Sequence, residues 1–244
     1  MYFSVITPED RLLRQAAHEL AQSSYAEHQW LWKFFPSSAN QTRDFIFRRH
    51  ELEQMPRFYV ISQRLPTSFS EAWHVQSRVY DPQLQEGQRF SFQLRANPVI
   101  TKNNAAGKSQ RHDVVMQAKQ QLLAEHGLSK EAKWADWKDE SSKPLLYELV
   151  QKHCAEWLDG VAKRNGFAIA LTETDEEKPQ HMLQVDAYEQ RKAGKRDHNI
   201  RFSVVDFSGE LLITNPELFH LALYNGLGHA KAFGCGLLLV RRLV

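Results

Sequence analysis

The chain has 244 residues, 42% of them apolar, and a formal net charge of +2 at pH 7. Its length exceeds the roughly 100 to 150 residues of a usual single domain, which predicts two modest domains. The small net charge announces no nucleic-acid partner, the two cysteines are too few for a disulfide framework or zinc cluster, and no segment approaches the about 18 consecutive apolar residues of a membrane span. We therefore expect a cytoplasmic protein without membrane association, metal or cofactor.

The first 98 residues have the pattern of an α+β unit. "MYFSVI" predicts a strand, "PEDRLLRQAAHELA" predicts a helix that begins at Pro8, and "SSYAEHQWLWKFF" continues helically until Pro36. "TRDFIFRRHEL", "PRFYVISQRL" and "QRFSFQLRANP" alternate apolar and polar residues, as paired strands do. We expect an N-terminal domain over residues 1–98. Residues 99–143 are polar and lysine-rich, with one predicted helix, and indicate a linker with an insertion.

A second unit of the same kind is expected over residues 144–244. "PLLYELVQKHCAEWLDGVAKRNG" has helical spacing and stops at Gly166, and "FAIALTE" and "HMLQVDAYEQ" predict strands. "NIRFSVVDF" predicts another strand, which turns at Ser208–Gly209 and returns as "ELLIT". Each unit thus mixes a few antiparallel strands with one or two helices. This points to an α+β protein of two tandem ferredoxin-like domains.

The chain ends on a glycine-rich loop between a helix and a strand. Asn215 is a good N-cap and Pro216 a good first residue for the helix "NPELFHLALYNG", while "GLLLVRRLV" predicts a strand. The order helix, loop, strand argues against both a dinucleotide fingerprint and a Walker-type phosphate loop. The fingerprint also lacks its third glycine, since Lys231 stands there, and this loop has no Gly-Lys-Ser/Thr triplet. Two interpretations stay open: a structural turn, or a backbone that approaches a polyanion beside a lysine. The loop residues concerned are Gly226, Gly228, Lys231, Gly234 and Gly236.

A possible proton-transfer pair lies in the first half of the chain. Tyr25 and His28 are three residues apart, which on a helix places them on one face. A histidine near its ordinary pKa can transfer protons, a phenol can orient a phosphate, and Lys33 could stabilise negative charge. The alternative is an ordinary amphipathic helix whose "WLWKFF" segment belongs to the core.

A basic segment joins the strands expected at 181–190 and 199–207. It places Arg191, Lys192, Lys195 and Arg196 at the tip of a hairpin. A two-stranded ribbon with four cations at its end can enter a nucleic-acid groove and hold phosphates. The alternative is a solvated loop tip.

Several segments together resemble the CasE endoribonucleases, the CRISPR-RNA processing subunits of Cascade-type complexes. They are Gly-Leu-Gly-x5-Gly-Cys-Gly at the end, "FQLRANP" followed by "GKSQRH", Tyr25-x-x-His28 with Lys33, and "VVDFSGELLITNPELF". The resemblance runs from the first strand to the last residues. It implies two ferredoxin-like, RNA-recognition-motif-like domains, partnership with the CRISPR repeat stem-loop, and assembly with other Cascade subunits, especially the backbone subunit.

The resemblance also implies a mechanism and roles for residues. Cleavage at the base of the stem would need no metal, because the 2′-hydroxyl attacks the adjacent phosphate and leaves a 2′,3′-cyclic phosphate and a 5′-hydroxyl. His28 would act as general acid or base, Tyr25 as its partner and Lys33 as electrostatic support. RNA contacts would come from the basic hairpin, the glycine-rich loop and three residues of the linker, namely Lys102, Lys108 and Arg111.

Two further hypotheses stay open beside this one. A non-catalytic RNA-binding scaffold subunit of the same fold would bind the stem-loop without cleaving it. A small-molecule enzyme that holds a nucleotide at the glycine-rich loop is disfavoured by the position of that loop.

Overall fold

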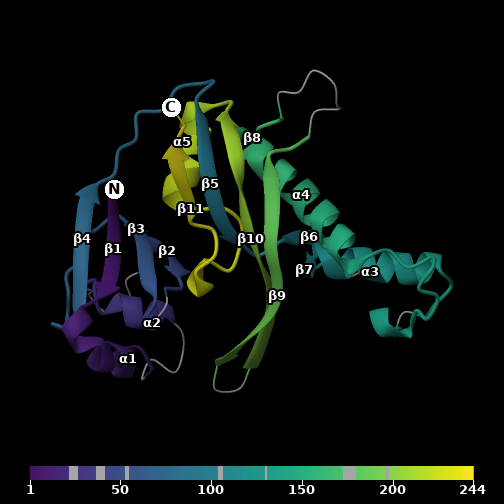
Figure 1. The fold of residues 1–244 in the computed structure, drawn as a ribbon, viewed down its shortest axis with the longest axis horizontal. Coiled ribbons are helices and arrows are strands. Elements are labelled where there is room, and N and C mark those ends of the chain that lie inside the picture. The colour runs from purple at the N-terminus through teal and green to yellow at the C-terminus, as the bar shows by residue number, and fades with distance from the viewer. Residues whose placement is uncertain are drawn as a thin grey trace.

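The computed structural model describes residues 1–21, 27–36, 42–52, 55–103, 107–129, 131–172, 180–195 and 198–243. Two antiparallel sheets lie side by side, and a helical insertion projects from the second (Figure 1). Within these residues no helix is both long and apolar enough to cross a membrane. The mixed architecture confirms the expected α+β class.

The first sheet has the strand order of a ferredoxin-like domain. Its order is β2-β3-β1-β4, and every pair is antiparallel. The strands are β1 (Tyr2–Pro8), β2 (Phe45–His50), β3 (Arg57–Ser62) and β4 (Trp73–Val79). Between β1 and β2 the chain forms η1 (Asp10–Leu12), α1 (Leu13–Ala21) and α2 (Glu27–Trp32). Residues 63–72, which join β3 to β4, contain no helix.

The first helix begins later than expected. Pro8 is the last residue of β1, where it pairs with Trp73 of β4, and regular helix starts only at Leu13. The "WLWKFF" segment belongs to the core, as the alternative interpretation predicted. Trp30 is fully buried, with its ring centroid 4.9 Å from Phe58 and 4.4 Å from Trp73.

The second sheet holds a complete βαββαβ unit. Its order is β11-β5-β10-β8, with β9 paired along the other part of β10. The strands are β5 (Arg89–Ala96), β8 (Phe167–Ile169), β9 (Leu183–Lys195), β10 (His198–Ile213) and β11 (Leu238–Arg242). The helices are α4 (Leu146–Arg164) and α5 (Pro216–Asn225).

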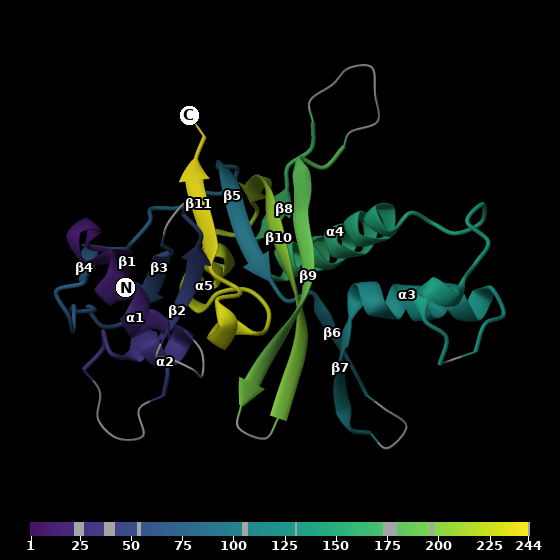
Figure 2. The same cartoon turned by 60° about the horizontal axis from the view of Figure 1, so that its bottom comes forward.

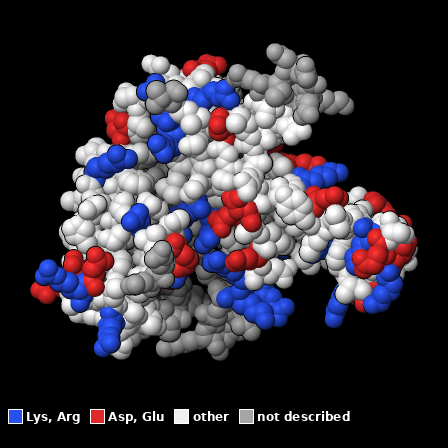
Figure 3. Space-filling model, in the orientation of Figure 1, with Lys and Arg blue, Asp and Glu red and all other residues white. Residues whose placement is uncertain are grey.

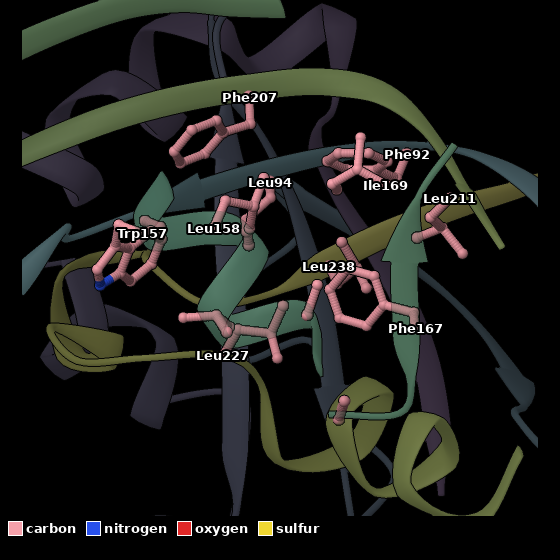
Figure 4. Close-up of a cluster of buried hydrophobic side chains, with 14 of the residues drawn as sticks. Phe92, Leu94, Trp157, Leu158, Phe167, Ile169, Phe207, Leu211, Leu227 and Leu238 are labelled. Carbon is pink, nitrogen blue, oxygen red and sulfur yellow. The ribbon is translucent and has the colours of Figure 1, made fainter. Parts of the chain in front are cut away.

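One face of this sheet packs against α4. Figure 4 shows side chains of β5, β8, β10 and β11 converging on Trp157 and Leu158 of α4. Leu227, from the segment after α5, closes the same cluster. The alternating strand residues and the helical spacing of α4 therefore meet in one core, as their periodicities require.

The strand β5 lies in the second sheet, not in the N-terminal unit as the domain bounds 1–98 implied. It pairs with β10 on one side and β11 on the other, and Phe90, Phe92 and Leu94 are buried in the core beside α4. The boundary between the sheets thus falls between Val79 and Arg89. The alternation of "RFSFQLRA" predicts a strand correctly, but a period of two says nothing about which strands pair with it.

Residues 99–143 are more ordered than a linker. They form the hairpin β6 (Val99–Asn103) and β7 (Ser109–Asp113), then α3 (Val114–Glu125) and η2 (Trp134–Asp136). Val115 of α3 is buried in the core of the second sheet, and Trp157 Nε1 donates a hydrogen bond of 3.1 Å to the carbonyl of Val99. The insertion therefore packs against the second domain.

The turn expected at Ser208–Gly209 is wrong, because β10 continues through both residues to Ile213. Gly209 allows the backbone of β10 to lie close to the residues at the start of β9. A Cβ added there would lie 2.2 Å from the carbonyl oxygen of Met182. The register shift between Asp206 and Phe207 accommodates the long, bent strand.

Candidate nucleic-acid interface

The two sheets meet at an apolar junction beside β2. Both faces of β2 are buried: Phe45 and Phe47 face the first core, whereas Ile46 contacts a small cluster with Ile61 and Leu237. β2 thus ties the helices of the first domain to the segment that leads into β11. The candidate catalytic helix α2 is therefore held next to the glycine-rich loop.

Asp206 links both domains at this junction through two arginines. Arg95 of β5 donates to its carboxylate in a bidentate pair, with N–O distances of 2.9 and 2.7 Å. Arg48 of β2 approaches the same carboxylate at 3.5 Å and is 7% exposed. Burial lowers the pKa of Arg48, and the carboxylate of Asp206 opposes that change. Arg48 thus depends on Asp206 for its countercharge.

The glycine-rich loop is a close-packed turn. Leu227 N donates to Gly236 O at 2.8 Å, and Gly236 N donates to Arg95 O at 2.7 Å. At Gly236, where φ is +91°, a Cβ would lie 2.6 Å from the carbonyl oxygen of Leu227. At Gly226, φ is +71° and a Cβ would lie 3.0 Å from Ile46. These two glycines meet the structural interpretation of the loop.

The same loop carries Lys231 toward α2. Lys231 begins the short helix η3 (Lys231–Phe233), which packs near α2 and β2. Gly234, at φ +76°, lets the backbone pass the ring of Phe47, which a Cβ would meet at 3.2 Å. Gly228 is exposed, with ordinary space around it. A structural turn and a placed lysine therefore coexist, and the two interpretations of the loop are compatible.

His28 lies on α2, the helix that contacts η3. Trp30 and Leu31 anchor the short helix in the core, and Glu27 pairs with Arg49 at 2.5 Å. The pKa of His28 is lowered from its ordinary value, first by burial and second by the positive charge of Arg43. The imidazole is therefore held in its neutral form near pH 7, which is the form that accepts a proton.

Arg43 is a site residue that the sequence did not reveal. It stands just before β2, and its charge lowers the pKa of Lys231 as well as that of His28, although burial is the larger cause in both. We call His28, Arg43 and Lys231 the junction cluster. Its three groups come from different segments, and the charge of Arg43 disfavours the protonated forms of the other two. A bound anion would relieve this repulsion, so the cluster is suited to a phosphate.

The other two predicted catalytic residues are placed differently. Lys33 is exposed, with Nζ 5.3 Å from the ring centroid of Phe69, and the cation acting on His28 is Arg43. Tyr25 lies outside the described residues. The expected face shared by Tyr25 and His28 therefore stays a prediction.

The basic hairpin differs from its expected form because both strands are longer. Arg191 and Lys192 lie within the β9–β10 ladder, opposite Phe202 and Arg201, and not at the tip. Lys195 pairs through its backbone with His198, whereas Arg196 lies outside the described residues. Basic residues gather over the lower part of this ribbon (Figure 3). The polar run "RKAGKRDH" suggested a loop, yet its first five residues are paired with β10 in the long ribbon.

A cavity of about 560 Å³ lies between the β9–β10 ribbon, the β6–β7 hairpin and the glycine-rich loop. Its charged lining is almost entirely basic, and Phe202 and Phe233 add aromatic surface with ring centroids 4.7 Å apart. The basic residues are Arg111, Arg191, Lys192, Arg201 and His229. Burial lowers the pKa of His229, with smaller effects of the charges of Arg111 and Lys231. The cavity thus joins three of the predicted RNA-binding segments.

The β6–β7 hairpin supplies the remaining predicted cations. Lys102, Lys108 and Arg111 are all exposed, and Arg111 lines the basic cavity. Figure 2 shows this hairpin and the β9–β10 ribbon extending toward the same side of the molecule. Arg201, Phe202 and Phe233 were missed by the sequence analysis. Alternation along β10 could have indicated that Arg201 shares a face with Ser203, but not that this face borders the glycine-rich loop.

Comparison with known families shows to which family the chain belongs. A family model described as "CRISPR associated protein" matches residues 1–242. The chain belongs to the CRISPR-associated protein family. The resemblance to CasE noted in the motifs is confirmed within that family.

Relatives of this CRISPR-associated protein match over nearly its whole length. The Cascade subunit CasE of Escherichia coli strain K12 is 28% identical over 227 residues, which cover 91% of this chain and 94% of the relative. Thermus thermophilus Cse3, solved with an RNA representing a pre-cleavage complex, has a TM-score of 0.65 at 20% identity, over 98% of each chain. Cas6e of E. coli has a TM-score of 0.55 at 21% identity, over the full length of both chains. The expected tandem ferredoxin-like fold is confirmed.

Proposed function

We propose that this protein is an endoribonuclease that processes precursor CRISPR RNA within a Cascade-type complex. It cleaves at the base of the repeat stem-loop without a metal ion and keeps the product bound. CasE similarity supports the RNA class and the assembly with other Cascade subunits, the backbone subunit among them. The observation that carries the chemistry is the junction cluster, where the charge of Arg43 acts on both a half-buried His28 and Lys231, next to a basic cavity.

The proposed reaction uses the 2′-hydroxyl of the RNA as nucleophile. Neutral His28 accepts the proton of this hydroxyl, and the new bond to phosphorus expels the 5′-oxygen, which takes up a proton. The products are a 2′,3′-cyclic phosphate and a 5′-hydroxyl. Arg43 and Lys231 stabilise the added negative charge at phosphorus. Tyr25 orients or protonates a reacting oxygen, and Lys33 adds positive charge at the end of α2.

RNA binding is assigned to the basic cavity and its surroundings. Arg191, Lys192 and Arg111 contact the stem through its phosphates, and Lys102 and Lys108 extend this contact along the β6–β7 hairpin. Lys195 and Arg196 are proposed to contact RNA as well. Double-stranded RNA is recognised largely through shape and backbone, which suits a set of exposed cations. The glycine-rich loop supports this surface by placing Lys231. We place this activity in the cytoplasm.

Cleavage in excess EDTA tests the proposed chemistry. A labelled repeat stem-loop is incubated with the protein beside a second substrate with 2′-deoxyribose at the scissile position. We expect cleavage only of the RNA that keeps the 2′-hydroxyl, and a product end that acid converts from cyclic phosphate to monophosphate. Tight binding of both substrates without cleavage would instead favour a scaffold subunit.

Replacing Arg43 with glutamine should shift the pH dependence of cleavage. The charge of Arg43 lowers the pKa of His28, so its removal raises that pKa. If His28 is the base, the acidic limb of the rate profile then moves to higher pH, while the maximal rate also falls because phosphate loses a cation. The profile of single-turnover rates and the NMR titration of His28 measure both effects. Arg14→Gln, on the exposed face of α1, is the control. An unchanged acidic limb would exclude this coupling.

A further inference from the structure

The insertion at 114–143 forms a second cavity that the proposed function does not use. The cavity has a volume of about 440 Å³ and lies between α3, η2 and the β9 strand. Lys119, Lys133 and Trp134 line it on the side of the insertion, and Tyr188 and Gln190 line it on the side of β9. No carboxylate is among the described residues that line it.

This cavity adjoins the basic cavity. Met116 and Gln190 line both, and Gln190 Nε2 donates a hydrogen bond of 3.4 Å to Met116 Sδ. Both side chains are exposed, so the boundary between the cavities consists of two flexible groups. Tyr188, Gln190 and Lys192 alternate along β9 and form one wall of roughly 13 Å. We call the two adjoining cavities, from His229 to Trp134, the groove.

The far end of the groove combines an aromatic ring with cations. Lys119 Nζ lies 5.9 Å and Lys143 Nζ 5.5 Å from the ring centroid of Trp134. Lys143 is held away from the cavity by a hydrogen bond of 3.1 Å to the carbonyl of Trp137, whereas Lys119 lines the cavity. Burial lowers the pKa of Lys119, with Asp113 opposing that change.

Asp113 lines the basic cavity, and one of its carboxylate oxygens accepts hydrogen bonds from the protein itself. Its Oδ1 accepts from the backbone nitrogen of Met116 at 2.7 Å, as the N-cap of α3, and from Tyr188 Oη at 2.9 Å. The carboxylate therefore fixes the helix against β9. Asp113 is the one carboxylate among the described residues that line either cavity.

Aromatic surface in a basic groove fits single-stranded nucleic acid better than a duplex. Bases of a duplex stack on one another, so their faces are closed to protein side chains, whereas unpaired bases stack on aromatic rings while cations follow the backbone. Phe202 and Phe233 at one end of the groove and Trp134 at the other provide such rings.

We propose that the unpaired RNA next to the repeat stem leaves the basic cavity and enters the second cavity, with a base stacked on Trp134 and a phosphate bound by Lys119 or Lys133. This inference rests on the proposed function, because the stem must first be bound at the basic cavity. It gives the insertion a role as an extension of the RNA-binding surface. The affinity of the protein for its transcript would then have separate contributions from the stem and from the flank.

Binding measurements with two kinds of RNA test the inference. One RNA is the bare stem-loop, and the other carries six unpaired nucleotides, placed on either side in separate substrates, with 2′-deoxyribose at the scissile position. We expect one flank to tighten binding to the unmodified protein. Trp134→Leu should weaken binding of that RNA by about 10-fold and leave the bare stem-loop unchanged, whereas Trp134→Phe keeps most of the gain. A 4-thiouridine in the flank should crosslink to the peptide that contains Trp134.

A pair of charge reversals controls for misfolding of the insertion. Lys133→Glu reverses an exposed charge that lines the groove, and Lys138→Glu reverses an exposed charge on the same insertion outside its lining. Only Lys133→Glu should reduce the gain from the flank. An absent gain, equal effects of the two reversals, or a loss of bare stem-loop affinity in Trp134→Leu would overturn the inference. Failure of the unmodified protein to bind the bare stem-loop would overturn the proposed function itself.

Discussion

Replacement of His28 with alanine is expected to slow RNA cleavage by about 10²- to 10⁴-fold, the usual contribution of a positioned proton-transfer group. Affinity for the stem-loop should stay nearly unchanged, because the cations that hold phosphates lie on other segments. Trp30 and Leu31 keep α2 anchored in the core when the imidazole is removed. Single-turnover cleavage and equilibrium binding, measured on the same RNA, separate the two effects.

His74 provides a matched control for this experiment. It is exposed on β4, the strand at the edge of the first sheet that lies away from β2. His74→Ala should retain the cleavage rate of the unmodified protein. A His28→Ala protein that cleaves within about threefold of normal would remove His28 from the mechanism, and parallel losses of cleavage and binding would indicate a structural role.

Replacement of Asp206 with alanine should have the largest effect on stability. Its carboxylate is the countercharge of the buried Arg48 and the bidentate partner of Arg95, and it joins the first sheet to the second. Breaking a buried pair by removing one partner costs about 3 to 5 kcal/mol, because the remaining charge stays buried without compensation. Urea denaturation, followed by far-ultraviolet circular dichroism, measures the loss in unfolding free energy.

The ion pair between Arg89 and Glu210 provides a control for the Asp206 substitution. It also joins β5 to β10, but its N–O distance is 3.4 Å and the two side chains are 36% and 26% exposed. Glu210→Ala should therefore cost about 0 to 1 kcal/mol, as exposed pairs do. Equal costs for the two substitutions would show that Asp206 contributes no more than a surface charge. An Asp206→Ala protein that unfolds in two separate transitions would locate the loss at the junction of the domains.

Local chemistry made several elements of this fold predictable. The helix α5 runs from Pro216 to Asn225 because Asn215 Oδ1 accepts from the backbone nitrogen of Leu218 at 2.9 Å and Gly226 takes a positive φ. The residues that fix those ends are neighbours in the chain, so their spacing suffices to find them. The strands β2 and β3 were predicted as a pair for a similar reason, since a short connection joins them.

The partners of the central strands depended on contacts between distant residues. The periodicity of β5 defines a buried face, but its pairing with β10 and β11 joins residues more than 100 positions apart. The continuous course of β10 likewise depends on Met182, whose carbonyl leaves room only for Gly209. The alternation of residues along one strand does not identify the strands that pair with it.

The amino-acid sequence by itself determined the family, the α+β class, the candidacy of His28 and the turn chemistry of the last loop. Those properties follow from residue types at fixed spacings along the chain. The tertiary structure decided that Arg43 lies close enough to His28 and Lys231 to lower the pKa of each, and that Arg111, Arg201 and His229 share one cavity. Electrostatic coupling and cavity shape depend on distances across space, and here those distances are set by the packing of two sheets at the junction beside β2.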